Sequence, residues 1–312
     1  MIGVTTSPID VAAAVLGTRA RRHEPVGPLT TYRVGGRAAL FFIAESRDDL
    51  QLVARAVGES GVPVVVLGRG SNMLVADAGF EGLVVTLGAF AAHIDVDTGR
   101  VTAGGAVLLP VLGRRTAAVG LTGLEWMVGI PGSVGGAVRM NAGGHGSDMD
   151  AVLGRVHIVD VATGEDCDVA PRALALRFRG SGLADPQVVV AARFDLAPGD
   201  RSRSEADIAE IVRWRREHQP GGQNCGSVFV NPVPFELSAG EVIDALGLRG
   251  FRIGSASVSE KHANFIQADE GGSADDVRAV MEAVRARVLQ DRGIALRSEV
   301  RLVGFDEGGG AR

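Results

Sequence analysis

Hydrophobic and polar positions alternate between strand-like and helix-like spacing in the N-terminal third of the chain. Apolar runs at 40–44 (LFFIA) and 63–67 (PVVVL) predict two strands, and helically spaced apolar positions over 48–57 predict a helix between them. A glycine-containing loop, 68–72, follows the second strand directly. This order is typical of units that bind ligands at the ends of strands.

The next part of the chain is rich in predicted strands. The pattern also indicates one helix, over 108–119. The predicted strands are LVVTL (83–87), HIDVD (93–97), GRVTA (99–103), VHIVDV (156–161) and VVVAARFDL (188–196). Together with the first unit, they indicate an α+β protein.

The C-terminal third contains three predicted helices and a final strand. A helix over 205–217, with Ser204 as its N-cap, is expected to end before Pro220 and to connect to a third unit. The other two helices begin at a serine followed three residues later by an acidic residue, namely Ser238 with Glu241 and Ser273 with Asp276. The segment 298–305 (SEVRLVGF) predicts the closing strand, and the glycine-rich end, 308–312, is expected to be disordered.

Composition narrows the class of function. A net charge of -5 and a pI near 5.7 disfavour binding to nucleic acid or to an anionic membrane. No apolar run is long enough to span a bilayer, and no basic region precedes the N-terminal apolar stretch, so we expect a cytoplasmic protein without a signal peptide. Cys167 and Cys225 form no metal-binding or disulfide motif, and we expect no metal site.

The loop after the second strand offers a place for a phosphate. Gly68 and Gly70 allow close approach of the backbone, and Ser71 and Asn72 add hydrogen-bonding groups. Taken alone, the loop is better explained as a tight turn. It lacks the third glycine of the dinucleotide-binding fingerprint, and the sole lysine, Lys261, lies far from any Walker-type loop, so both common nucleotide-binding folds are disfavoured.

A second glycine-dense segment lies at 123–146. Six glycines fall between Gly129 and Gly144. Packing would account for one or two of them, but such a run leaves little side chain to bury. We therefore expect this segment to line something flat or charged.

Three further segments contain candidate chemical groups. Ser227 follows Gly226 in NCGSVFVNP (224–232), SEKHANFI (259–266) gathers polar residues before an apolar stretch, and Glu299 lies in the predicted last strand. Taken individually, Ser227 is explained as a turn residue, the segment 259–266 as a solvated edge and Glu299 as a surface carboxylate. No serine-hydrolase motif accompanies Ser227.

Taken together and in this order, the segments resemble a known family. GRGSN (68–72), GIPGSVGGAVRMNAG (129–143), CGSVFVNP (225–232) and SEKHANF (259–265) are similar to the motifs of UDP-N-acetylenolpyruvoylglucosamine reductases, flavoenzymes of peptidoglycan precursor synthesis. The only tyrosine is Tyr32, so the chain resembles the shorter subclass that lacks a tyrosine-bearing insertion. The resemblance implies an α+β fold with a two-part FAD-binding domain of the vanillyl-alcohol-oxidase type and a smaller C-terminal α+β substrate domain.

The resemblance also implies a domain order. The expected parts are an N-terminal extension (1–28), two FAD-binding subdomains (29–88 and 89–200), a connector helix (201–220), a substrate-binding domain (221–306) and a tail (307–312).

The family's chemistry implies the cofactors FAD and NADPH and a UDP-sugar enolpyruvyl ether as substrate. Hydride would pass from reduced FAD to the vinyl carbon, giving UDP-N-acetylmuramate. Ser227 matches the proton donor, Arg179 the residue beside the substrate carboxylate, and Glu299 the carboxyl group near the enolate. A protonated Glu299 would require a raised pKa.

Binding residues follow from motif position. The expected substrate contacts are Asn231, His262 and Asn264. The expected cofactor contacts are Tyr32, Gly68, Arg69, Gly70, Ser71, Asn72, Met73, Gly129, Ile130, Pro131, Gly132, Ser133, Gly135, Gly136, Asn141, Ala142 and Gly143.

The chain departs from the family pattern at two positions. Phe178 stands where a tyrosine often precedes the catalytic arginine, and Val230 stands where a lysine is common. Contacts to the substrate diphosphate would then come from arginines or from the backbone.

Two other functions fit the glycine segments. Another FAD-linked oxidase or dehydrogenase, acting on a sugar lactone or hydroxy acid, would leave Ser227, Arg179 and Glu299 without a joint role. A flavin-binding sensor or subunit would need no proton donor. We expect a monomer whose partners are small molecules, with no nucleic acid and no membrane.

Overall fold

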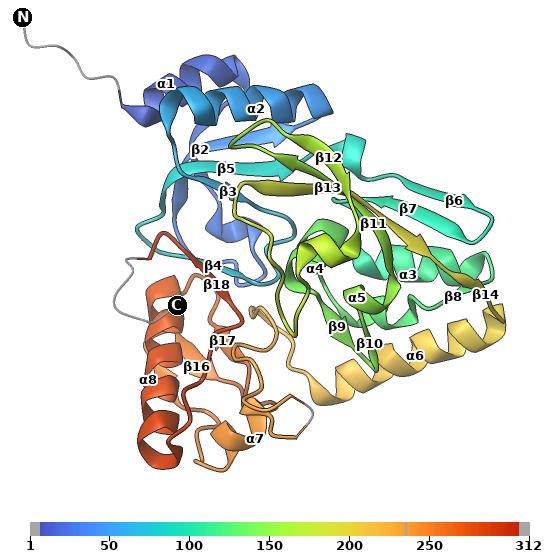
Figure 1. Ribbon diagram of the computed structural model, residues 1–312. Helices are drawn as coiled ribbons and strands as arrows, with labels where there is room; N and C mark the ends of the chain where they lie inside the picture. The colour runs from blue at the N-terminus through green and yellow to red at the C-terminus, as the bar shows by residue number, and fades with distance from the viewer. Residues whose placement is uncertain (1–6, 235, 306–312) are drawn as a thin grey trace, which may run out of the picture. The chain divides into compact units, whose positions relative to one another are not determined.

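The computed structural model describes residues 7–234 and 236–305, so the predicted glycine-rich end lies outside the described residues. The chain forms two compact units (Figure 1). The first contains the segment up to Arg22, Leu40–Arg69 and Gly82–Arg215. The second contains His23–Ala39, Gly70–Glu81 and the segment from Arg216. Each unit therefore combines stretches that are separated in sequence.

A four-stranded sheet, most of whose residues belong to the first unit, has the order β1-β2-β5-β3. Its strands are β1 (Arg21–Pro25), β2 (Arg37–Ala44), β3 (Val64–Val66) and β5 (Phe80–Leu87), and β3 runs parallel to β5. Helices α1 (Pro8–Leu16) and α2 (Arg47–Ser60) lie side by side in Figure 1 and share a hydrophobic core with β2 and β5. Ser46 caps α2, because its side chain accepts a hydrogen bond from Asp49 N. The predicted strand–helix–strand unit is confirmed.

A five-stranded antiparallel sheet forms the rest of the first unit's framework, in the order β12-β11-β13-β7-β6. Its strands are β6 (Ile94–Asp97), β7 (Arg100–Gly104), β11 (Leu153–Asp160), β12 (Asp166–Val169) and β13 (Gln187–Asp195). Side chains along β13 alternate between two cores, as expected for a strand covered on both faces. Val188 and Val190 pack with α1 and α2, whereas Val189 packs with α3 (Leu109–Ala118) and α4 (Val134–Met140).

Short elements complete the first unit. β8 (Leu121–Thr122) pairs with β14 (Ala197–Pro198), β9 (Gly143–Gly144) pairs with β10 (Ser147–Asp148), and α5 (Met149–Val152) follows β10. The chain also has short 3-10 helices, η1 (Gly17–Arg19), η2 (Gly27–Leu29), η3 (Ala89–Ala91), η4 (Glu125–Gly129) and η5 (Pro171–Leu174).

Helix α6 spans Arg201–His218 and begins earlier than predicted. Asp200 caps the N-terminus of the helix instead: its side chain accepts a hydrogen bond from Arg203 N at 2.8 Å. Ser204 is buried inside the helix, and its hydroxyl donates to Glu125 Oε1 at 2.5 Å. The prediction that Ser204 is the N-cap is therefore wrong: the hydroxyl makes a tertiary hydrogen bond.

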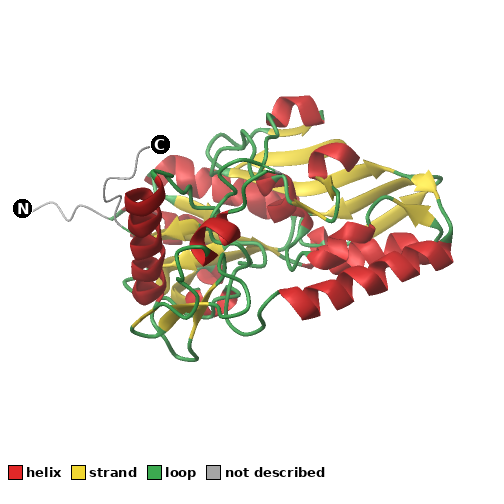
Figure 2. Cartoon of the chain, turned by 90° about the horizontal axis from the view of Figure 1, so that it is seen from below, coloured by secondary structure: helices red, strands yellow, loops and turns green. Residues whose placement is uncertain are grey.

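The second unit packs a long helix against a small sheet. The antiparallel strands β15 (Arg252–Ile253), β16 (Ala256–Val258) and β17 (Ile266–Ala268) share a core with α8 (Ala274–Arg292). Figure 2 distinguishes the helices, in red, from the strands, in yellow. The predicted caps are confirmed. Ser238 forms a full capping box with Glu241 at the start of α7 (Ala239–Asp244), and Ser273 accepts from Asp276 N at the start of α8.

The predicted closing strand is shorter than expected. Only β18 (Arg301–Val303) is a strand, and it runs parallel to β4 (Met73–Val75). Glu299 lies two residues before β18 and outside the strand. Its N–H donates to Val228 O at 2.8 Å, whereas Arg301 N donates to Asn72 O at 3.0 Å. The backbone thus changes partner between these two residues, which ends the regular ladder.

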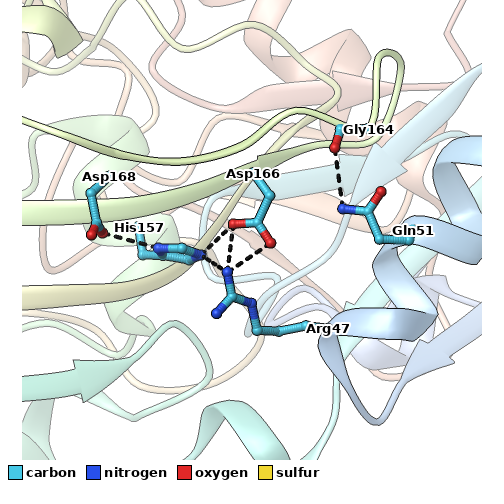
Figure 3. A network of polar contacts seen from close by, with 6 residues as sticks. All are labelled: Arg47, Gln51, His157, Gly164, Asp166 and Asp168. Carbon is cyan, nitrogen blue, oxygen red and sulfur yellow. Dashed lines mark hydrogen bonds and ion pairs between the residues drawn. The ribbon is translucent and has the colours of Figure 1, made fainter.

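A charged network joins α2 to the β11–β12 hairpin of the first unit (Figure 3). Arg47 Nη2 lies 2.6 Å from Asp166 Oδ1 and 2.8 Å from His157 Nε2. His157 also lies 2.9 Å from Asp168 Oδ1 through its Nδ1 atom. Arg47 and His157 lower the pKa of Asp166, with the hydrogen bond from Arg47 as the largest cause. The network links two elements through charged groups at the surface.

Candidate active site

The loop at 68–72 lies between β3 and β4, so no helix follows it, as expected. Gly70 has φ 60°, and a Cβ there would come within 2.6 Å of Thr30 Cα. Gly70 O also accepts from Thr31 N at 3.1 Å. Gly70 is therefore required by backbone conformation and close packing. Gly68 differs, because a Cβ there would meet only Ser133 Oγ, at 2.8 Å, among atoms within 4 Å.

The second glycine segment runs through η4, α4 and β9. A Cβ at Gly135 would come within 3.1 Å of Val189 O, one at Gly143 within 2.5 Å of Asp148 Cβ, and one at Gly129 within 3.1 Å of the His145 ring. Packing thus accounts for three of these glycines, and the expectation of one or two was too low. The structure places α4 close against the five-stranded sheet, a contact that the sequence pattern does not reveal.

Other glycines of this segment have open space around them. A Cβ at Gly144 would meet nothing within 4 Å, and one at Gly136 would meet only Ser133 Oγ, at 3.7 Å. The N–H groups of Val134 and Gly135 at the start of α4 donate to the carbonyls of Val107 and Gly105, both at 2.9 Å. Bare backbone at Gly68, Gly136 and Gly144 can accommodate a flat or charged group, so these residues fit a dinucleotide cofactor.

The predicted cofactor residues differ in exposure and fall in both units. Gly68, Arg69 and the residues of 129–143 belong to the first unit, and Tyr32 with 70–73 belongs to the second. Gly68, Arg69, Pro131 and Gly136 are exposed; Ser71, Asn72, Gly129, Ile130, Gly135, Ala142 and Gly143 are half-buried; Tyr32, Gly70, Met73, Gly132, Ser133 and Asn141 are buried.

Two of the buried residues have identified structural roles. The backbone of Asn141 adopts the left-handed conformation, with φ 40°. Its side chain accepts from Asp150 N at 2.9 Å and donates to Arg177 O at 3.2 Å. Tyr32 is fully buried in the core of the second unit beside Cys225. Burial raises the pKa of the Tyr32 hydroxyl, and the Cys225 thiol adds to this, but the two groups are not aligned as an ordinary hydrogen bond. Burial likewise raises the pKa of Cys225 to about 12.

Arg179 occupies a tight turn of the first unit. Arg177 and Gly180 exchange backbone hydrogen bonds across the turn, at 2.9 Å and 3.0 Å. Arg179 has φ 56°, a conformation that costs a residue with a Cβ roughly 1 kcal/mol. Its guanidinium donates to Gly143 O at 2.8 Å and lies 5.3 Å from the Phe178 ring. The side chain is thus held by a carbonyl of the glycine-rich segment and by the ring of the preceding residue, Phe178.

Ser227 and Glu299 lie on neighbouring backbone segments of the second unit. The contacts that join the segments are Glu299 N to Val228 O at 2.8 Å and Val230 N to Arg297 O at 2.9 Å. Asn72 Nδ2 donates to Glu299 O at 2.9 Å, which ties the first glycine loop to the same place. Both Ser227 and Glu299 are half-buried. The structure therefore places the backbone segments that bear Ser227, Glu299 and Asn72 next to one another.

The predicted substrate contacts have partners within the second unit. Asn231 accepts from Ala239 N at 3.1 Å, at the start of α7. Asn264 is buried and bonds to the backbone of Phe229 in both directions. His262 accepts from Asn264 N at 3.2 Å, and burial, helped by Arg249, lowers its pKa. The two bonds between Asn264 and Phe229 join segments 35 residues apart, so no local sequence pattern reveals them.

A cavity of about 490 Å³ in the first unit was not predicted. It lies between α6 and the 123–147 region, and none of the predicted site residues lines it. Its lining consists of Gly123, Glu125, Trp126, His145, Ser147, Asp207, Glu210, Ile211 and Trp214. His145 and Trp214 form an edge-to-face pair with ring centroids 5.2 Å apart. Both tryptophans of the chain line this cavity.

Two family models match the chain. A model described as "FAD binding domain" matches residues 38–169. A model described as "UDP-N-acetylenolpyruvoylglucosamine reductase, C-terminal domain" matches residues 218–303. The first match contains both glycine segments, and the second contains Ser227 and Glu299.

Whole-chain relatives extend these matches. A UDP-N-acetylenolpyruvoylglucosamine reductase from Heliobacterium modesticaldum is 44% identical over 295 residues, covering 92% of this chain and 91% of the relative. The chain belongs to the UDP-N-acetylenolpyruvoylglucosamine reductase family. A family member from Synechococcus sp. strain WH7803 is 39% identical, covering 92% of this chain and 94% of the relative. The crystal structure of the reductase from Thermus caldophilus matches with a TM-score of 0.79 at 32% identity, covering 91% of this chain and 99% of that one.

Family membership confirms several predictions. The chain is an oxidoreductase of the UDP-N-acetylenolpyruvoylglucosamine reductase family, a group of flavoproteins of peptidoglycan synthesis. Its α+β fold combines an FAD-binding domain with a C-terminal domain of the reductase family. Among the described residues, no helix is long and apolar enough to cross a membrane.

Proposed function

We propose that this chain reduces UDP-N-acetyl-3-O-(1-carboxyvinyl)-glucosamine to UDP-N-acetylmuramate with electrons from NADPH. The observation that carries the proposal is the placement of Ser227 and Glu299 on adjacent, hydrogen-bonded segments of the second unit. A hydroxyl and a carboxyl group carried on paired backbone segments suit a reaction in which a basic enolate must be stabilised and then protonated.

The residues that would hold FAD are those of the two glycine segments. Gly68, Gly136 and Gly144 offer bare backbone, and Ser71 offers a half-buried hydroxyl. When bound, FAD would accept hydride from NADPH and supply hydride to the terminal vinyl carbon of the substrate. Tyr32 and Asn141 would act through the packing and hydrogen bonds of the surrounding backbone, because both side chains are buried.

Ser227 would donate the proton. Addition of hydride to the vinyl group leaves negative charge on the neighbouring carbon and its carboxylate, and the Ser227 hydroxyl would protonate that carbon. Gly226 precedes it with φ 82°, a conformation that favours glycine and directs the turn before Ser227. The segment after Ser227 is fixed by its bonds to residues 297–299.

Arg179 and Glu299 would stabilise the developing charge. The Arg179 guanidinium, fixed through Gly143 O and Phe178, would pair with the substrate carboxylate. Glu299 in its protonated form would donate a hydrogen bond to the enolate oxygen. The backbone of Glu299 is fixed by Val228 and Asn72, which would anchor the base of its side chain beside the segment that follows Ser227.

We further propose the expected domain roles and location. Residues 29–88 and 89–200 would bind FAD, and the region matched by the reductase-specific model would bind the sugar nucleotide. The enzyme would act as a monomer in the cytoplasm, where NADPH is available.

Absorbance spectroscopy of the purified, FAD-loaded protein tests this proposal. Without oxygen, NADPH should bleach the flavin band, and the enolpyruvyl sugar nucleotide should restore it. A sugar lactone or a hydroxy acid should not change the reduced or oxidised spectrum. If the enolpyruvyl substrate leaves the reduced flavin unchanged, the proposed reaction is wrong; response to a lactone or hydroxy acid would instead indicate another oxidase or dehydrogenase.

A further inference from the structure

We infer that Asn264 is a positioning residue for Ser227 and does not contact the substrate. The inference rests on the proposed role of Ser227 as proton donor. The side chain of Asn264 makes two hydrogen bonds to one residue: Asn264 Nδ2 donates to Phe229 O at 2.8 Å, and Asn264 Oδ1 accepts from Phe229 N at 3.0 Å. A side-chain amide that bonds both backbone groups of one residue imitates the pairing of an antiparallel strand.

The backbone of Asn264 continues this pairing. Its carbonyl accepts from Val228 N at 2.8 Å. The two residues after Ser227 are therefore held on one side by Asn264, through its main chain and its side chain together. Substitution of Asn264 removes only the side-chain part, so the effect of the amide can be measured while the Val228 bond remains.

The opposite side of the same segment is also held. Val228 O accepts from Glu299 N, and Val230 N donates to Arg297 O. The short stretch from Val228 to Val230 thus lies between Asn264 and the segment that bears Glu299. Because Ser227 directly precedes this clamped stretch, the position of its hydroxyl relative to Glu299 depends on both sides of the clamp.

Burial separates this role from substrate binding. Asn264 is 3% exposed, so almost none of its surface is available to a ligand. Asn231 and His262, the other two expected substrate contacts, are half-buried. The amide of Asn264 is neutral, and it satisfies the N–H and C=O of Phe229, which are themselves buried. Misplacement of a catalytic group by about 1 Å can slow a reaction about 10²-fold, so a loss of this support should appear in the rate.

Rapid-mixing kinetics of Asn264→Asp test the inference. The aspartate keeps the shape of the side chain and one acceptor, but it replaces the donor to Phe229 O with an oxygen that repels it. Reduction of the flavin by NADPH should stay within about twofold of wild type, because Ser227 has no part in it. Reoxidation by the enolpyruvyl sugar should fall about 10²-fold, with the dissociation constant of the sugar changed less than about threefold.

Asp276→Asn is the matched control in the same unit. Asp276 Oδ2 accepts from both the N–H and the hydroxyl of Ser255, each at 2.7 Å, so it also joins two segments through one side chain. Its substitution should weaken folding of the second unit but leave both half-reactions unchanged. Hydrogen exchange of the peptide over 224–232, measured without cofactor, should be faster in Asn264→Asp than in wild type and unchanged in Asp276→Asn.

Three outcomes would overturn the inference. A raised dissociation constant for the sugar with normal reoxidation would make Asn264 a substrate contact. Equal loss of both half-reactions, or equal loss in Asp276→Asn, would reduce its role to general stability. If Asn264→Asp does not fold, Asn264→Ser, which removes bulk but adds no charge, is measured in the same way. Failure of the wild-type enzyme to be reoxidised by the sugar would refute the proposed function itself, which distinguishes the two failures.

Discussion

Two polar clusters in this molecule differ in charge and in burial. The network of Arg47, His157, Asp166 and Asp168 in the first unit is charged, and the Arg47 side chain is 55% exposed. The cluster around Asn264 in the second unit is neutral and buried, and it uses one amide to satisfy the backbone of Phe229. Water can replace the partners of the first cluster but not those of the second. We therefore expect the neutral cluster to contribute more to stability, although the charged one has more short contacts.

The largest expected difference comes from Asn264→Ala. The substitution leaves the N–H and C=O of Phe229 buried without their side-chain partners, and an unsatisfied buried polar group costs about 1–3 kcal/mol. We expect the free energy of unfolding to fall by about 2–3 kcal/mol in urea denaturation followed by circular dichroism. A loss below about 0.5 kcal/mol would show that water reaches Phe229 and would remove the contrast between the clusters.

Arg47→Ala should have a smaller effect. It removes the bonds from Arg47 to Asp166 and His157, but exposed ion pairs contribute about 0.2–1 kcal/mol because water and salt screen them. The expected loss in the same assay is below about 1 kcal/mol, and it should shrink further in 1 M salt. Arg55→Ala is the control, since Arg55 lies on the same helix with only a 3.9 Å contact to Glu59. A loss for Arg47→Ala that equals that for Asn264→Ala would contradict the comparison.

The smallest expected effect is a dependence on pH. The hydrogen bond from Arg47 lowers the pKa of Asp166, so the native state favours the charged carboxylate more than the unfolded state does. The stabilisation is therefore fully present above the unfolded pKa of about 4 and is lost as the pH falls through the lower folded value. The difference in unfolding free energy between wild type and Arg47→Ala should be constant from about pH 5 to pH 8 and should decrease below about pH 4. An increase of the difference at low pH would refute this assignment.

Local signals predicted much of the secondary structure. The caps at Ser238 and Ser273 are confirmed because a capping hydroxyl and the N–H that it binds are three residues apart, within one segment. The prediction failed at Ser204. Two possible caps, Asp200 and Ser204, stand four residues apart; Asp200 caps the helix, and the Ser204 hydroxyl donates to Glu125 instead. The choice between them depends on a residue distant in sequence, which no local pattern contains.

The candidate site was also predictable only where a local sequence motif identifies the residues. The motif around Ser227 and the one around Glu299 identify the family, but their adjacency depends on the bond from Glu299 N to Val228 O. Asn264 was expected to contact the substrate from its motif position, whereas its hydrogen bonds point to the backbone of Phe229. The glycine at 135 likewise reflects contact with Val189 O on the five-stranded sheet, which becomes visible only in three dimensions.

The proton-donor role of Ser227 is the central claim, and reoxidation of the reduced flavin in Ser227→Ala tests it most directly. NADPH should reduce the flavin of this variant at the wild-type rate, because the hydroxyl takes no part in that step. Reoxidation by the enolpyruvyl sugar nucleotide should be about 10²–10⁴-fold slower than in wild type, the usual contribution of a general acid. Reoxidation at the wild-type rate would contradict the account.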